Sequence, residues 1–300
     1  MSSTGPVMVG VDGSPASLCA VEWAADEADR RGLPLEVVHV DPRATRYASG
    51  WPAFTRWDRG ASADVARGIL AEAARAAADR SPGVEVTCTT VAELPVPGLV
   101  GVARRAALLV LGRRRIGVAD ALLGFTARSV VERVSCPVIL VPAAGGASRR
   151  ETGPGVVVAV DPDENCRAVV DFAFEEASRR QVPLSAVHAW TALSPGPGLQ
   201  VLADDPDHAG FEQRRLLAEA VAGRQERFPD VAVRHHVVRG PARRVVPEAG
   251  DGATLLVVGA GGARVRGRTA LGPVSDAAIR RAPCPVAVVH GSDTTRGPRT

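Results

Sequence analysis

The sequence predicts an α/β fold made of two tandem, doubly wound domains, each with a five-stranded parallel sheet. Two observations lead to this prediction. Short, almost wholly apolar runs alternate with segments of helical period, and the whole pattern occurs twice within 300 residues. Apolar strands that alternate with helices are typical of a parallel sheet covered on both faces by right-handed crossovers.

The repeat consists of short blocks that return in the same order about 148 residues later. Val7–Asp12 (VMVGVD) returns as Val156–Asp161 (VVVAVD), and Cys136–Val138 (CPV) returns as Cys284–Val286. A period this long holds a complete domain rather than one unit of a solenoid. The predicted parts are a first domain at residues 1–142, a linker at 143–155 and a second domain at 156–300.

The elements of the first half follow from local sequence. Val7–Val11 is an apolar strand, and the turn residues after it precede a helix whose apolar face recurs every three or four residues. Gly32 ends that helix. The later elements are predicted to be a strand at 35–40, helix at 61–80, strand at 84–91, helix at 99–105, strand at 107–111, helix at 126–134 and strand at 138–141.

The second half repeats this series. Its predicted strands lie at 156–160, 184–189, 231–238, 254–258 and 286–289, with helices between them. Each half also carries an irregular insertion after its second strand, Asp41–Gly60 in the first half and Thr191–Pro206 in the second. We interpret the aromatic residues of the first insertion as packing against the edge of the sheet.

Composition argues against several classes of function. All 36 basic residues are arginine, so neither a lysine Schiff base nor a Walker-type phosphate loop is available. The net charge of +3 comes from interspersed acids and bases, and no apolar run is long enough to span a membrane. The five cysteines lack CxxC spacing, which indicates reduced thiols. We therefore expect a cytoplasmic protein that binds neither nucleic acid nor membrane.

Candidate binding residues stand at the carboxyl ends of the predicted strands. Ligands of doubly wound sheets bind at this edge, where the strand order reverses. Asp12 and Asp161 follow the first strand of each half, and Val40 and Ala189 end the second strands.

A glycine-rich segment follows the fourth strand of each half. In the second half Gly259, Gly262 and Gly272 lead into a helix start, where backbone N–H groups and the helix dipole attract anions. In the first half Gly112 and Gly124 lie one residue closer together, and Arg115 replaces the middle glycine. For a glycine pair alone, a tight strand-to-helix turn would be the better explanation.

Taken together and in order, these motifs resemble the universal stress protein family. The resemblance rests on Val-Gly-Val-Asp-Gly-Ser, the His-Val at the end of the second strand, Gly-x2-Gly-x9-Gly and Ala-Pro-Cys-Pro-Val. It implies pairing of the two halves through their last strands, with a homodimer as an open alternative, and ATP, alone or with Mg²⁺, as the ligand. The implied ligand-binding residues are Asp12, Val40, Gly112, Gly124, Asp161, Ala189, Gly259, Gly262, Gly272 and Val274.

Both halves depart from the family's pattern. That pattern has Ser or Thr directly after the last glycine, where this chain has Phe125 and Pro273, and proline has no N–H to donate. Three functions remain open: a nucleotide-responsive regulatory module with an unidentified protein partner, an interaction scaffold with degenerate sites, and a slow ATP hydrolase. We expect the first, a non-enzymatic stress-response protein, with the nucleotide in the second half.

Two pairs of equivalent residues are predicted to be structural. His39 and His188 end the second strands, where satisfied ring nitrogens are the more common state. Cys136 and Cys284 precede the last strands beside proline, where a buried, inert thiol is expected.

Overall fold

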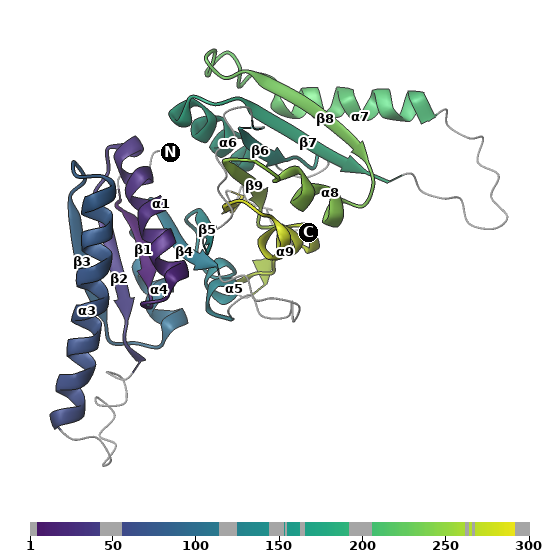
Figure 1. Ribbon diagram of the computed structural model, residues 1–300. Coiled ribbons are helices and arrows are strands. Elements are labelled where there is room, and N and C mark those ends of the chain that lie inside the picture. The colour runs from purple at the N-terminus through teal and green to yellow at the C-terminus, as the bar shows by residue number, and fades with distance from the viewer. Residues whose placement is uncertain are drawn as a thin grey trace, which may run out of the picture. The chain divides into compact units, whose positions relative to one another are not determined.

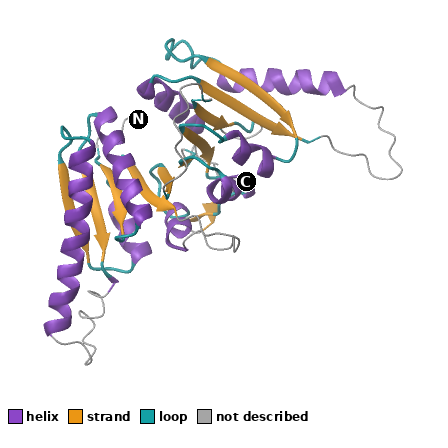
Figure 2. Ribbon diagram, viewed as in Figure 1, coloured by secondary structure: helices purple, strands orange, loops and turns teal. Residues whose placement is uncertain are grey.

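The computed structural model describes residues 5–42, 56–113, 125–143, 153, 155–162, 166–191, 206–261, 264–265 and 268–291. The chain divides into two compact units, one formed by residues 1–146 with 263–270 and the other by 147–262 with 271–300 (Figure 1). Each unit contains five parallel strands with helices packed against them (Figure 2). The predicted α/β fold of two tandem five-stranded domains is confirmed.

The sheet of the first half has the order β3-β2-β1-β4-β5, so the strand order reverses between β1 and β4. Every neighbouring pair is parallel, and Val7 lies level with Leu35 on one side and Leu108 on the other. The strands are β1 (Val7–Val11), β2 (Leu35–Val40), β3 (Val86–Val91), β4 (Leu108–Arg113) and β5 (Val138–Pro142).

Two pairs of helices cover this sheet, since α1 packs against α3 and α4 against α5. Right-handed crossovers place the two pairs on opposite faces. Their bounds are α1 (Pro15–Arg31), α3 (Arg56–Arg80), α4 (Pro95–Ala103) and α5 (Phe125–Val131). Three helices begin earlier than predicted, α5 by a single residue. In α4 the early start is explained by Pro95, because proline is well accommodated in a first helical turn.

The second half repeats the topology with the strand order β12-β9-β6-β7-β8. Its strands are β6 (Val156–Ala159), β7 (Leu184–Trp190), β8 (Val233–Arg239), β9 (Leu255–Gly259) and β12 (Val286–Val289). Its helices are α6 (Arg167–Arg180), α7 (Pro206–Val221), α8 (Ala242–Ala249) and α9 (Pro273–Arg281). A short antiparallel hairpin, β10 (Arg264–Val265) and β11 (Arg268–Thr269), lies between β9 and α9 in the sequence.

The first insertion after β2 is shorter than predicted, because α3 begins at Arg56 rather than at residue 61. The rest of that insertion, 43–55, and residues 192–205 of the second insertion lie outside the described residues. The cores consist mainly of the Val, Leu and Ala side chains of the central strands and the helix faces against them. The low aromatic content of 4% predicts such an aliphatic core.

Candidate functional site

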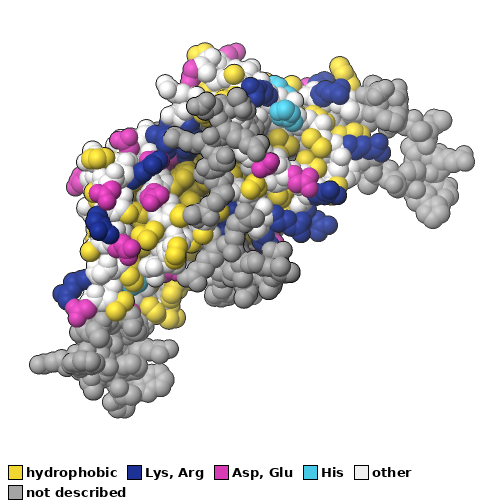
Figure 3. All heavy atoms as spheres, viewed as in Figure 1, with side chains coloured by type: hydrophobic (Ala, Val, Ile, Leu, Met, Phe, Trp, Pro, Cys, Tyr) yellow, Lys and Arg dark blue, Asp and Glu magenta, His cyan; other side chains and the backbone are white. Residues whose placement is uncertain are grey.

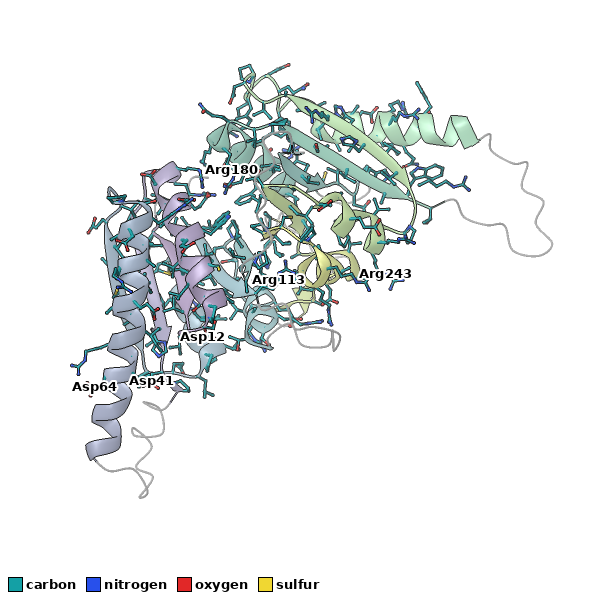
Figure 4. The ribbon with its side chains drawn as sticks, viewed as in Figure 1. Asp12, Asp41, Asp64, Arg113, Arg180 and Arg243 are labelled. Carbon is teal, nitrogen blue, oxygen red and sulfur yellow. The ribbon has the colours of Figure 1, made fainter. Side chains whose placement is uncertain are left out.

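The register of the first sheet brings the predicted residues of the first half together. Val11 pairs with His39 and Gly10 pairs with Leu111. Continued by one or two residues, this register puts Asp12 level with the end of β2 and with Arg113, directly beyond Gly112. Neighbouring strands are roughly 4.8 Å apart, so these residues form one edge of the sheet. Figure 4 shows Asp12 and Asp41 at this edge.

The second sheet gathers its predicted residues in the same way. Ala159 pairs with Val187, and Val158 pairs with Val257. By the same continuation, Asp161 lies level with Ala189 at the end of β7 and next to Gly259 at the end of β9. The predicted acid, the end of the second strand and the first glycine therefore meet at the switch point of each half.

The two equivalent histidines tie the strand ends together. His39 Nδ1 lies 2.9 Å from the carbonyl oxygen of Val11, and His188 Nδ1 lies 3.0 Å from that of Val160. Because a carbonyl only accepts, Nδ1 carries the proton in both rings. His188 Nε2 also lies 2.9 Å from the side-chain amide of Gln213, and because this nitrogen accepts, the amide presents its NH2 group to it. In both rings Nδ1 is bonded within the fold, in agreement with a structural role.

Asp12 closes the turn that leads into α1. The backbone N–H of Ser14 donates to Asp12 Oδ1 at 3.0 Å, and Ser14 Oγ accepts from the N–H of Ser17 at 3.3 Å as the helix cap. Asp41 was not predicted as a site residue, yet it is buried at this edge and its N–H donates to the Val91 carbonyl at 2.9 Å. Its position directly after Val40 was the available signal.

In the second half a hydrogen bond joins the two ends of the glycine-rich segment, and we call this closed end the glycine base. The N–H of Gly272 donates to the carbonyl of Ala260 at 2.9 Å. Gly261 has φ +58°, and a Cβ on it would lie 3.2 Å from Gly272 Cα, tighter than ordinary side-chain contacts. Small residues are therefore required here, and the close approach brings the first turn of α9 beside the end of β9. A backbone cradle of this kind fits an anionic group.

Ser275 fastens this arrangement from α9. Its buried Oγ donates to the carbonyl of Gly259 at 2.5 Å. Gly272 is the N-cap of α9 and Pro273 its first residue, so Val274 supplies the first helical N–H. Gly261 and Ser275 were not among the predicted site residues; the doublet Gly261-Gly262 and a serine in the first turn of the helix were the available signals.

The equivalent glycine of the first half meets a different constraint. A Cβ on Gly112 would lie 2.4 Å from the carbonyl oxygen of Ala16 and 2.8 Å from the N of Ser17. Gly112 is therefore required for packing of the end of β4 against the first turn of α1. A Cβ on Gly259 would lie 3.3 Å from Val169 Cγ2, a side-chain methyl that can move.

Several sequence candidates lie outside the described residues. These are Gly124, Gly262 and Arg115, and nothing is assigned to the side chain of Phe125. The structure consequently places the start of each glycine segment, and in the second half also its end at Gly272 and Val274.

The remaining chemistry of the described chain is modest. Among the residues that the structure places, no group of three His, Cys, Asp or Glu side chains could hold a metal ion, and no helix has the length and apolarity to cross a membrane. Acidic and basic side chains are interspersed over the visible face of the first half (Figure 3). All five cysteines are free thiols, and burial raises the pKa of Cys136 to about 11, consistent with the predicted inert role.

Comparison with known proteins gives one consistent result. The model of the universal stress protein family matches residues 4–142 and again 155–290. The chain is 35% identical to universal stress protein Rv1996 of Mycobacterium tuberculosis, over 95% of this chain and 94% of that protein. It is 36% identical to Rv2005c of the same organism, over 95% and 97%. A crystal structure of a universal stress protein from Archaeoglobus fulgidus shares the fold, with a TM-score of 0.70 at 17% identity and 98% coverage of both chains.

Proposed function

This chain belongs to the universal stress protein family, and we propose that it is a regulatory member that binds ATP, alone or with Mg²⁺, in its second half. The observation that carries the proposal is the closed glycine base at Ala260, Gly261 and Gly272. It brings the first turn of α9, where Val274 supplies the first helical N–H, beside the end of β9, and a nucleotide phosphate would bind there. Asp161, one strand away, is exposed at the same edge.

The proposed contacts follow from the chemistry of each group. An exposed carboxylate accepts hydrogen bonds from hydroxyl groups, so Asp161 would bind the ribose. The backbone near Ala189 would border the adenine ring. The residues proposed to face the phosphates are Gly259, Gly262, Gly272 and Val274. The first half is proposed to hold a weaker site, formed by Asp12, Val40, Gly112 and Gly124. It is weaker because Gly112 packs directly against the backbone of α1.

Binding would act on a protein partner rather than on the nucleotide. An ordered glycine segment changes the surface beside α9, which is a common form of ligand-controlled recognition. The chain has no lysine, and backbone N–H groups hold the ground state as strongly as the transition state. We therefore propose little or no ATP turnover. A rate near the enzyme median of about 10 per second would contradict this part of the proposal.

The test uses a matched pair of isosteric variants and calorimetry with ATP. In Asp161→Asn the ribose would lose a charged acceptor, worth about 1.5–3 kcal/mol, so affinity should fall at least tenfold. In Asp12→Asn the remaining Oδ1 can still accept from Ser14, so the fold should persist and ATP affinity should change less than twofold. The reverse pattern would move the nucleotide to the first half.

An interaction scaffold without nucleotide is the second candidate. Two observations favour it: Pro273 has no N–H at the first position of α9, and the hydroxyl of Ser275 is already bonded to Gly259. Mass spectrometry of small molecules released on denaturing freshly purified protein separates the two. Absence of any adenine nucleotide, together with no heat of ATP binding, would support the scaffold. Pairing of the halves through β5 and β12 stays a prediction.

A further inference from the structure

A groove of about 900 Å³ lies between α4 and α5 of the first half. Its lining is mainly apolar, and Leu94 at its rim is 57% exposed. Exposed apolar surface of this kind on one element indicates an interaction rather than a folding requirement. The apolar lining consists of Leu94, Pro95, Val96, Pro97, Val100 and Gly101, and the polar lining of Arg104, Thr126 and Arg133.

The second half shows which part of α4 the fold itself needs. The fourth strands of the two halves are offset by 147 residues, and the same offset matches Leu99 on α4 with Val246 on α8. Both side chains are buried, at 6% and 3% exposure. The inward face of this helix is therefore apolar in both copies, as packing on the sheet demands.

The outward face differs between the copies at several positions, although Val100 corresponds to the apolar, buried Pro247. Val96 corresponds to Arg243, which Figure 4 shows on α8, and Gly101 corresponds to Glu248. In α8 this face is solvated and carries an exposed ion pair, with Arg244 Nε donating to Glu248 Oε1 at 3.0 Å. The same fold thus accepts a charged outer face, so the apolar groove of α4 is a separate feature of the first half.

The groove also carries uncompensated positive charge. Within the described residues Arg104 forms no ion pair, and Arg133 Nη1 donates only to the backbone carbonyl of Ser129 at 2.6 Å. Thr126 adds a hydroxyl to the same lining. Guanidinium groups beside an apolar wall match a ligand with an apolar body and an anionic end.

We propose that this groove binds an aliphatic carboxylate, with its acyl chain along the apolar wall and its head group between Arg104 and Arg133. The volume lies in the range of small-molecule sites, roughly 300–1,000 Å³, and the lining has the usual composition of such sites: apolar walls and a few polar groups. The positive charge of the two guanidinium groups favours an anionic ligand over a neutral one, because their hydrogen bonds to a carboxylate are stronger than those to a neutral acceptor.

Gly101 offers a way to fill the groove without disturbing the fold. A Cβ there would meet no other heavy atom within 4 Å. Gly101 lies inside α4, where replacing glycine by a better helix former favours folding. Gly101→Leu therefore blocks the groove while the helix is retained, and Gly101→Ala is the matched small substitution.

The experiment measures binding of decanoate and of 1-decanol to the full-length protein by calorimetry. We expect one molecule of decanoate per chain in the wild type, at least tenfold weaker binding in Gly101→Leu and less than threefold change in Gly101→Ala. The double variant Arg104→Gln/Arg133→Gln should lose at least tenfold in affinity for decanoate. Wild-type binding of decanol should already be at least tenfold weaker than that of decanoate.

The opposite results are equally definite. Equal binding of decanoate by wild type and Gly101→Leu, or of decanol and decanoate by wild type, would overturn the proposal. Binding to anionic phospholipid vesicles without binding of free decanoate would mean that the groove is a membrane-contact surface, and the proposal would be wrong. Because α4 belongs to the first half and the main proposed nucleotide site to the second, ATP binding by the second half should be unchanged in Gly101→Leu whichever ligand occupies the groove.

Discussion

The two halves share a core but differ at two places, the glycine at the end of the fourth strand and the helix before that strand. In the first half Gly112 packs tightly on the backbone of α1, whereas the one tight contact of a Cβ on Gly259 in the second half would be with a side-chain methyl. The helix before the fourth strand presents an apolar groove in the first half and an exposed ion pair in the second. The two copies therefore agree in the residues that pack on the sheet and differ in residues that the sheet does not require.

This comparison suggests a division of labour. The glycine segment of the second half is closed by a hydrogen bond between Gly272 and Ala260, a geometry that suits a phosphate. In the first half the equivalent glycine, Gly112, packs against α1. This half has instead the apolar groove with two arginines between α4 and α5. The proposed ligands of the two halves are consequently different in chemistry.

The largest expected effect comes from the two equivalent glycines. Gly112→Ala would place a methyl group 2.4 Å from the Ala16 carbonyl, so backbone must move, at a cost of about 1–3 kcal/mol in the free energy of unfolding. In Gly259→Ala the nearest contact of the methyl group is Val169 Cγ2 at 3.3 Å, which can move, so that free energy should change by less than about 0.5 kcal/mol. Urea unfolding of both variants measures the difference. Equal losses would show that the two strand ends are packed alike.

The second largest expected effect is a fall in the free energy of unfolding at alkaline pH. Burial raises the pKa of Cys136 from 9.0 to about 11, so the folded state keeps a proton that the unfolded state releases. The stabilisation is complete below pH 9 and falls as the pH rises to 11, by up to about 1.4 kcal/mol per unit. Cys136→Ala should remove this slope. An unchanged slope in that variant would assign it to other groups.

The helix caps also distinguish the halves. Ser14 Oγ caps α1 by accepting from Ser17, whereas Cys166 at the start of α6 makes no side-chain cap bond. Ser14→Ala should cost about 1 kcal/mol of unfolding free energy, and Cys166→Ala should cost less than about half of that. Thermal unfolding of the two variants provides the measurement, and a larger loss for Cys166→Ala would refute the assignment of the cap.

The repeat and the apolar periodicity predicted the topology, because they report burial on both sides of a parallel sheet. Helix starts were predicted less well. The start of α4 at Pro95 was missed because apolar periodicity becomes visible only after the prolines of the first turn. Strand ends were located well enough to bring Asp12 and Asp161 to the correct edges.

The candidate site was only partly accessible to sequence reasoning. Gly112 and Gly259 occupy equivalent positions in the repeat, yet the distance from a Cβ to the neighbouring backbone separates them, and that distance depends on where α1 and α6 begin. The use of Ser275 as a bond to Gly259 depends on a contact between residues 16 apart. Such contacts follow from the tertiary arrangement and have no signature in spacing alone.

The smallest expected effect compares the outer faces of α4 and α8. Gly101→Ala removes a flexible residue from a helix interior where the added methyl group meets nothing within 4 Å, so it should raise the free energy of unfolding by about 0.5–1 kcal/mol. Glu248→Ala at the equivalent position removes an exposed ion pair with Arg244 and should change stability by less than about 0.5 kcal/mol. Unfolding of the two variants in urea, with saturating decanoate and without it, separates helix propensity from ligand binding.

Gly101→Ala should gain stability in both conditions, because its single methyl leaves most of the groove open. Loss of stability in the absence of ligand would show that residue 101 is packed rather than open, and the groove would then have a different shape from the one described.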